Sequence, residues 1–292
     1  MVMKRNAMRK NLLQSILKSF GRYIAIVAII ALGASMFVGL LMTKSDMVAT
    51  GQKFMDQQNM FDLRLISTYG WGQEQLAAVS QLEGVVDAEG VVYVDAVGRF
   101  DTDEEDSVYR LYKIPEKINR LSLQGGRMPL AANECVIEGF NMSDAILGTQ
   151  LRILDSNTDD TLDALVYKTY TIVGYVASPL YMDMNRGTTS VGNGSLANCL
   201  YVPGEGLNVD YFTEINVTLE GDYDVYSTEF NDMLKAAADE IEPVAIQLGK
   251  DRFNTLRTDA FESYREGRQE YYDGLTEYKK AKAEAMEELD DA

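Results

Sequence analysis

Apolar and polar positions change their pattern three times along the chain. The first 22 residues mix apolar and polar positions and carry six Lys and Arg residues, and Tyr23–Leu41 is an apolar run of 19 residues without a charged side chain. Between Ser45 and Leu219, short segments rich in Val, Ile, Tyr and Thr alternate with turn residues, which is typical of strands. From Val225 onward, apolar residues recur at helical spacing. The pattern predicts an N-terminal transmembrane helix, a mixed α+β domain and a long C-terminal helical arm.

The apolar run has the length that a membrane requires. As a helix it would reach about 28 Å, close to the hydrocarbon thickness of about 30 Å. A core helix would normally have one polar face, whereas this run is apolar all round. It is longer than the apolar part of a signal peptide, and no clear cleavage site follows Leu41. We interpret residues 23–42 as a transmembrane helix, with a buried core helix and a cleaved signal peptide as the alternatives.

Charge is distributed unevenly around this run. Six Lys and Arg residues and no acidic residue precede it, and the first acidic residue is Asp46. The whole chain has 27 basic and 45 acidic residues and a net charge of −18. The positive-inside rule therefore predicts a basic head, residues 1–22, in the cytoplasm and residues 45–292 outside the plasma membrane. The lipid bilayer is then a partner, whereas so acidic a body excludes nucleic acid as a general partner.

Small residues recur on one side of the expected membrane helix. Ala28, Ala31, Ser35 and Gly39 follow one another at spacings of three, four and four. Such a stripe lets another membrane helix approach closely. We interpret it as a packing stripe, although Ala and Gly are also simply common in membrane helices.

The segment 43–222 reads as one extracytoplasmic α+β domain. Strands are expected at 61–67, 85–100 (one or two strands), 108–112, 134–137, 149–154, 165–176, 200–202 and 212–219, and helices at 45–58 and 73–82. Polar or irregular connections are expected at 101–106, 118–129, 155–163 and 178–198, with Trp71 and Gly72 in one turn and Gly125 and Gly126 in another.

The helical arm, residues 223–292, carries a seven-residue repeat from about residue 251. Its expected a positions are Phe261, Arg268, Leu275, Lys282 and Leu289, and its d positions are Tyr264, Tyr271, Tyr278 and Ala285. These positions predict a coiled-coil seam, which two basic a positions weaken. The alternative is an amphipathic helix that packs on another surface. Pro243 is expected to interrupt the helix. No Gly or Pro ends the arm, so we expect a truncated arm whose mate is a returning second helix.

Several kinds of chemistry are excluded or weakly supported. The chain has no His, so it lacks Ser-His and Cys-His pairs and imidazole zinc ligands. It has no Gly-x-x-x-x-Gly-Lys-Ser/Thr loop for a nucleotide. The acidic segment 101–106 suits calcium or a solvated hairpin tip, and Asp155–Asp159 begins like a calcium loop. Asp160 and Val166 then stand where Gly and Glu are needed, so the second loop fails.

Cys135 and Cys199 both lie in the expected extracytoplasmic domain. They suit either a disulfide or two small apolar side chains in strands, and spacing does not decide between them. Taken together, we expect no catalytic, cofactor or metal site and no enzyme.

Several segments resemble a known family. The basic head and span look like the first membrane helix of FtsX-like ABC transporter permeases, and later segments are similar to their MacB-like extracytoplasmic core. The segments that carry the resemblance are Arg9–Gly33, Gly125-Gly-Arg-Met-Pro129, Asn133-Glu-Cys-Val-Ile137, Tyr170–Tyr181, Arg186–Ser195 and Tyr201-Val-Pro203.

The resemblance implies a permease that transmits motion rather than performing chemistry. Its partners would be an ATP-binding-cassette ATPase on the cytoplasmic side and further permease membrane helices. Family permeases have several membrane helices, whereas this chain has one such run. Two alternatives stay open, namely a single-span membrane-anchored binding or scaffold protein and a membrane-anchored extracytoplasmic enzyme.

Overall fold

The computed structural model describes residues 3–139, 142–182, 185–221 and 224–290. The side chains of residues 1–7, 16, 283–284 and 287–292 also lie outside this description. The chain divides into two compact units, Met1–Phe54 and Met55–Ala292. The expected domain boundary at 222/223 falls on residues outside the described ranges, so it stays a prediction.

The first unit is helical. Helix α1 spans Met3–Lys18 and helix α2 spans Phe20–Gln57, so the last turn of α2 belongs to the second unit. The expected helical continuation beyond Ser45 is confirmed. Within the described residues, α2 is the one helix long and apolar enough to cross a membrane, judged by length and composition.

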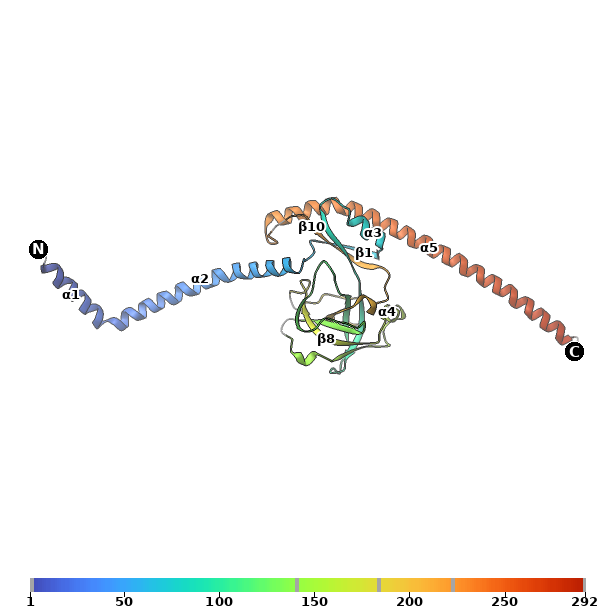
Figure 1. Ribbon diagram of the computed structural model, residues 1–292, viewed down its shortest axis with the longest axis horizontal. Helices are drawn as coiled ribbons and strands as arrows, with labels where there is room; N and C mark the ends of the chain where they lie inside the picture. The colour runs from blue at the N-terminus through green and yellow to red at the C-terminus, as the bar shows by residue number, and fades with distance from the viewer. Residues whose placement is uncertain (1–2, 140–141, 183–184, 222–223, 291–292) are drawn as a thin grey trace. The chain divides into compact units, whose positions relative to one another are not determined.

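The second unit contains a small sheet covered by two helices. In its described part, strands β1 (Leu63–Trp71), β10 (Phe212–Leu219) and β2 (Val85–Val91) pair in the order β1-β10-β2, each antiparallel to the next. Helices α3 (Gln73–Val79) and α5 (Thr228–Asp290) lie beside these strands (Figure 1). Their shared apolar core includes Trp71, Val79, Ile215, Val217 and Ile241. One face of the small sheet is therefore buried under the helices.

A larger mixed sheet forms the rest of the second unit. Its described strands are β3 (Tyr93–Phe100), β4 (Ser107–Lys113), β5 (Ser122–Gly126), β6 (Glu134–Glu138), β7 (Gln150–Ile153), β8 (Thr169–Ala177) and β9 (Leu196–Val202). They pair in the order β5-β8-β6-β9-β4-β3-β7, and β7 also pairs with β8. That extra pairing closes six of the strands into a barrel. Buried side chains such as Leu111, Leu151, Tyr170 and Ile172 form its core.

Three sequence-based expectations of local structure are wrong. The segment 118–129 is not irregular throughout, because Ser122–Gly126 forms β5 against β8. The loop 155–163 contains a short helix, α4 (Asp159–Asp163), because the Thr158 hydroxyl accepts from the N–H of Thr161 and caps it. Trp71 ends β1 instead of lying in a turn, and its side chain is buried in the core of the small sheet.

The expected interruption at Pro243 is also wrong. Helix α5 is continuous through this exposed proline, although proline removes a backbone donor. Ile241 on one side and Ala245 and Leu248 on the other all pack in the core of the small sheet. Their burial stabilises both halves of the helix in one orientation, so tertiary packing outweighs local propensity.

Candidate functional site

The end of α2 is held by the loop between β4 and β5. The contacts lie within the second unit, and we call these residues the helix anchor: Gln57, Gln58, Asn59, Lys117, Asn119 and Arg120. The backbone N–H of Arg120 donates to the Gln58 carbonyl at 2.7 Å, and that of Asn119 to the Asn59 carbonyl at 2.8 Å. The Arg120 guanidinium donates to the Gln57 carbonyl at 2.9 Å. The last carbonyl of the helix and the two that follow it are thus bound by protein groups.

Asn59 stops the helix by adopting a left-handed backbone, with φ of 51°. The N–H of Met60 donates to the Met55 carbonyl at 3.0 Å, and the N–H of Asn59 to the Asp56 carbonyl at 3.1 Å. This pair of bonds is the Schellman motif of helix C-termini, and Asn tolerates its left-handed position better than most residues. The helix therefore ends at a defined residue.

The helix anchor is connected to the small sheet through two acidic side chains. The Glu89 carboxylate on β2 accepts from the backbone N–H groups of Glu116, Lys117 and Ile118, at 2.6 to 2.9 Å. The Asp62 carboxylate accepts from the N–H of Leu219 on β10 at 2.8 Å. Burial raises the pKa of Asp62, and the Leu219 bond acts in the opposite direction. The end of α2 is thus tied to β2 and β10 as well as to the barrel.

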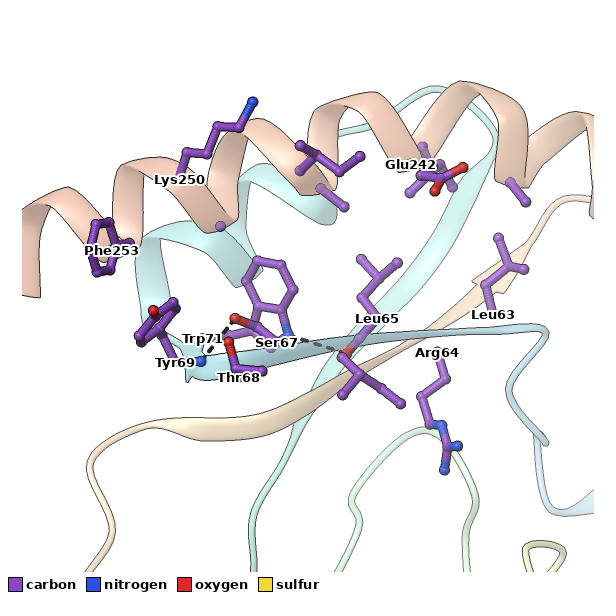
Figure 2. A pocket seen from close by; sticks show the side chains of 16 residues that line it. Leu63, Arg64, Leu65, Ser67, Thr68, Tyr69, Trp71, Glu242, Lys250 and Phe253 are labelled. Carbon is purple, nitrogen blue, oxygen red and sulfur yellow. Dashed lines mark hydrogen bonds between the residues drawn. The ribbon is translucent and has the colours of Figure 1, made fainter.

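A groove of about 730 Å³ lies between β1 and α5. Figure 2 shows Leu63, Leu65 and Trp71 pointing from β1 toward the helix, whereas Arg64 points away. The Trp71 indole donates to the Leu65 carbonyl at 3.1 Å, and the Tyr69 and Phe253 rings lie 4.9 Å apart at one end. Among the described strands none pairs with the outer edge of β1.

A buried ion pair fixes the Gly-rich connection between β8 and β9. The Arg186 guanidinium contacts the carboxylate of Glu138, which is 2% exposed. Burial raises the pKa of Glu138, and Arg186 opposes that change. Nearby, the hydroxyls of Tyr181 and Tyr112 lie 2.9 Å apart, and burial raises the pKa of Tyr112 to about 12. These contacts pin a segment that carries part of the sequence resemblance.

The two cysteines are free thiols on opposite sides of the barrel wall. Cys135 on β6 belongs to the barrel core, whereas Cys199 on β9 belongs to a separate apolar cluster with Tyr112 and Tyr201. Burial raises the pKa of both thiols, that of Cys199 to about 11. The disulfide that the sequence left open is absent from this structure.

The acidic loops use their carboxylates within the protein. Asp101 accepts from the N–H of Gln150 at 3.1 Å, Asp106 pairs with Arg99, and Asp155 lies 2.6 Å from Lys168. Among the residues that the structure describes, no group of three or more His, Cys, Asp or Glu side chains is arranged to hold a metal.

The predicted packing stripe lies on α2, and all four of its residues are exposed in the structure. The Ser35 hydroxyl donates to the Leu32 carbonyl at 3.1 Å, so it is satisfied within the helix. The predicted coiled-coil seam lies on α5 and is exposed except at half-buried Leu275, with the Leu289 side chain outside the described part of the chain. Both features stay predictions.

The helix anchor was not among the sites expected from the sequence. Asn59 and Asn119 lie sixty residues apart, and both adopt left-handed backbones, with φ of 51° and 57°. Asn is enriched at such positions, which is the only local signal. The pairing between the two segments depends on tertiary structure.

No protein-family model and no curated protein matches the chain. Several solved structures are similar to it, and three of them have identities of 14 to 17% and TM-scores of 0.32 to 0.33. The first is the extracellular domain of the noncanonic ABC-type transporter YknZ from Gram-positive bacteria, at 15% identity, covering 59% of this chain and 87% of that one.

Two further structures are similar to the chain. One is the periplasmic region of MacB from Actinobacillus actinomycetemcomitans, covering 59% of this chain and 74% of that one at 14% identity. The other is a domain assigned to a permease from Porphyromonas gingivalis, covering 60% and 77% at 17% identity. MacB is also named in the resemblance drawn from the sequence.

Proposed function

We propose that this chain is a permease subunit of an ABC transporter of the FtsX/MacB type. It couples a cytoplasmic ATPase to an extracytoplasmic domain for export or extraction of a substrate. One observation carries the proposal. The helix with the membrane-length apolar run continues without a break to Gln57. The Arg120 guanidinium binds the Gln57 carbonyl, and the backbone N–H groups of Arg120 and Asn119 bind the two carbonyls that follow.

The helix anchor suits the transfer of motion. A continuous helix resists bending because each turn is hydrogen bonded to the next. Its end is held by backbone bonds, and Glu89 and Asp62 extend these bonds to the small sheet. Within the second unit, a displacement of the last turn of α2 is therefore passed to the sheets.

The proposed partners follow from the same arrangement. The ATP-binding-cassette ATPase acts at the basic head in the cytoplasm, and the bilayer surrounds residues 23–42. Further permease membrane helices pack on the stripe of Ala28, Ala31, Ser35 and Gly39. The chain itself supplies no nucleotide-binding loop, so the purified chain should neither bind nor hydrolyse ATP.

Topology and assembly test the proposal. In intact cells, a membrane-impermeant maleimide should label Asp103→Cys, whereas Arg9→Cys should react only after the cells are opened. Chain isolated from native membranes should bring an ATP-binding-cassette ATPase with it. Labelling of Arg9→Cys in intact cells, or isolation of the chain without any ATPase, would contradict the proposal that the chain is a permease subunit.

The groove favours a second candidate, a membrane-anchored binding or scaffold protein. The unpaired edge of β1 offers backbone groups to an extended peptide strand, and the apolar groove suits alternate apolar side chains. Ile66 is 63% exposed beside this edge. Isolation of a partner that Ile66→Lys releases, with no ATPase present, would favour the scaffold over the permease.

A further inference from the structure

A small cavity lies where the helix anchor meets both sheets. Its volume is about 20 Å³. Asn119 lines it from the anchor, Asn216 from β10 of the small sheet and Tyr201 from β9 of the barrel. All three side chains are buried, with exposed fractions of 2%, 3% and 1%. The cavity thus collects polar groups from three parts of the fold.

Each of these side chains has a buried polar atom without a protein partner. The atoms are Nδ2 of Asn119, Oδ1 of Asn216 and the hydroxyl of Tyr201. The orientation of Asn119 is fixed, because its Oδ1 accepts from the N–H of Phe61 at 3.1 Å. Its Nδ2 is therefore a donor in need of an acceptor. Buried polar groups in folded proteins are nearly always paired, with protein atoms or with ordered water.

The chemistry of these groups selects the ligand. A buried water molecule needs a cavity of roughly 10–15 Å³ and two to four polar partners. Water accepts from Asn119 Nδ2 and donates to Asn216 Oδ1. A cation is disfavoured by the Asn119 amide hydrogens, and an anion by the Asn216 oxygen and the carboxylate of Glu89, which also lines the cavity.

Tyr201 also lines the cavity, and its hydroxyl lies next to the Ser178 side chain. Burial raises its pKa well above the ordinary value, with the neighbouring Ser178 side chain acting in the opposite direction. The hydroxyl is thus protonated and can either donate or accept.

We propose that this cavity, which Tyr201 also lines, is a binding site for a single structural water that bridges Asn119 Nδ2 and Asn216 Oδ1. The water joins the helix anchor to β10 of the small sheet. Asn119 then binds the chain after α2 through Oδ1 and the water through Nδ2. The proposal rests on the geometry of the cavity and not on the proposed function.

A crystal structure of the full chain in a lipid phase, at a resolution that shows ordered water, tests the proposal. The expected result is one density peak within hydrogen-bond distance of Asn119 Nδ2 and Asn216 Oδ1. An empty cavity, a direct bond between the two asparagines, or a metal ion with short oxygen contacts would each overturn the proposal.

Two variants sharpen the test. Asn216→Leu removes the acceptor and fills the cavity, so the peak should disappear. Thr218→Val is the matched control, because Thr218 is a buried residue of the same strand face with an unpaired hydroxyl but does not line the cavity. The peak should persist in Thr218→Val, and its loss there would contradict the assigned bridge.

Discussion

Asn119 combines a left-handed backbone with a buried, hydrogen-bonded side chain. Its backbone N–H binds Asn59 and its amide oxygen binds Phe61, so one residue secures two points of the chain that leaves α2. Few residue types meet both demands, since most side chains disfavour this backbone and apolar ones offer no acceptor.

Asn119→Gly should lower the stability of the folded unit. Glycine accepts the left-handed backbone but leaves the N–H of Phe61 without its acceptor, at a cost of about 1–3 kcal/mol. Trp71 is the one tryptophan in the sequence and is buried, so its fluorescence can follow thermal unfolding. Asn119→Ala should be at least as unstable, because it adds backbone strain. An unchanged melting temperature in Asn119→Gly would contradict this role.

Glu134 should make stability depend on acidic pH. Its pKa is lowered to about 2, first by Arg127 and then by the N–H of Leu130. A lowered folded-state pKa means that the contribution is present above the unfolded-state pKa and is lost as pH falls through the folded value. Between about pH 5 and pH 2, wild type should lose more thermal stability than Glu134→Gln. Parallel curves for the two proteins would contradict the assignment.

At the scale of elements, α5 is continuous through Pro243, a residue that usually breaks helices. Pro243 cannot donate to the carbonyl four residues earlier, and the packing on both sides compensates. Pro243→Ala should therefore raise the free energy of unfolding by about 1–3 kcal/mol. Trp71 fluorescence reports this change, because Trp71 shares the core under α5. Val244→Ala is the neighbouring control, and a fall in stability of Pro243→Ala would show that the proline fits a local bend.

The small-residue stripe on α2 makes a separate prediction. Gly39→Leu adds a bulky side chain where a Cβ meets no side chain and no other element within 4 Å, so the helix itself should be unaffected. Association with partner membrane helices should weaken, because small residues permit close approach. Crosslinking in native membranes measures this association, with Ile30→Leu as the control. Equal crosslinking in both variants would mean that the stripe faces lipid.

At the scale of the whole molecule, the sequence predicts the elements better than their arrangement. Apolar runs and alternation predict the membrane-length helix and most strands, since these are local signals. The closure of the barrel through β7 and β8, and the insertion of the barrel between β2 and β10, depend on long-range pairing. The candidate site was missed for the same reason, because Asn59 and Asn119 meet only in the folded chain.

The central claim is that the helix anchor couples the extracytoplasmic domain to the cytoplasmic ATPase. The most direct test is ATP hydrolysis by the isolated complex with wild-type chain, with Asn119→Gly and with the loop variant Asp103→Asn. If the anchor couples the two, Asn119→Gly should change the rate of ATP hydrolysis by about twofold or more, whereas Asp103→Asn should leave it unchanged. A twofold change corresponds to roughly 0.4 kcal/mol in activation free energy. Equal rates in all three complexes, with the folded unit intact by Trp71 fluorescence, would contradict the account.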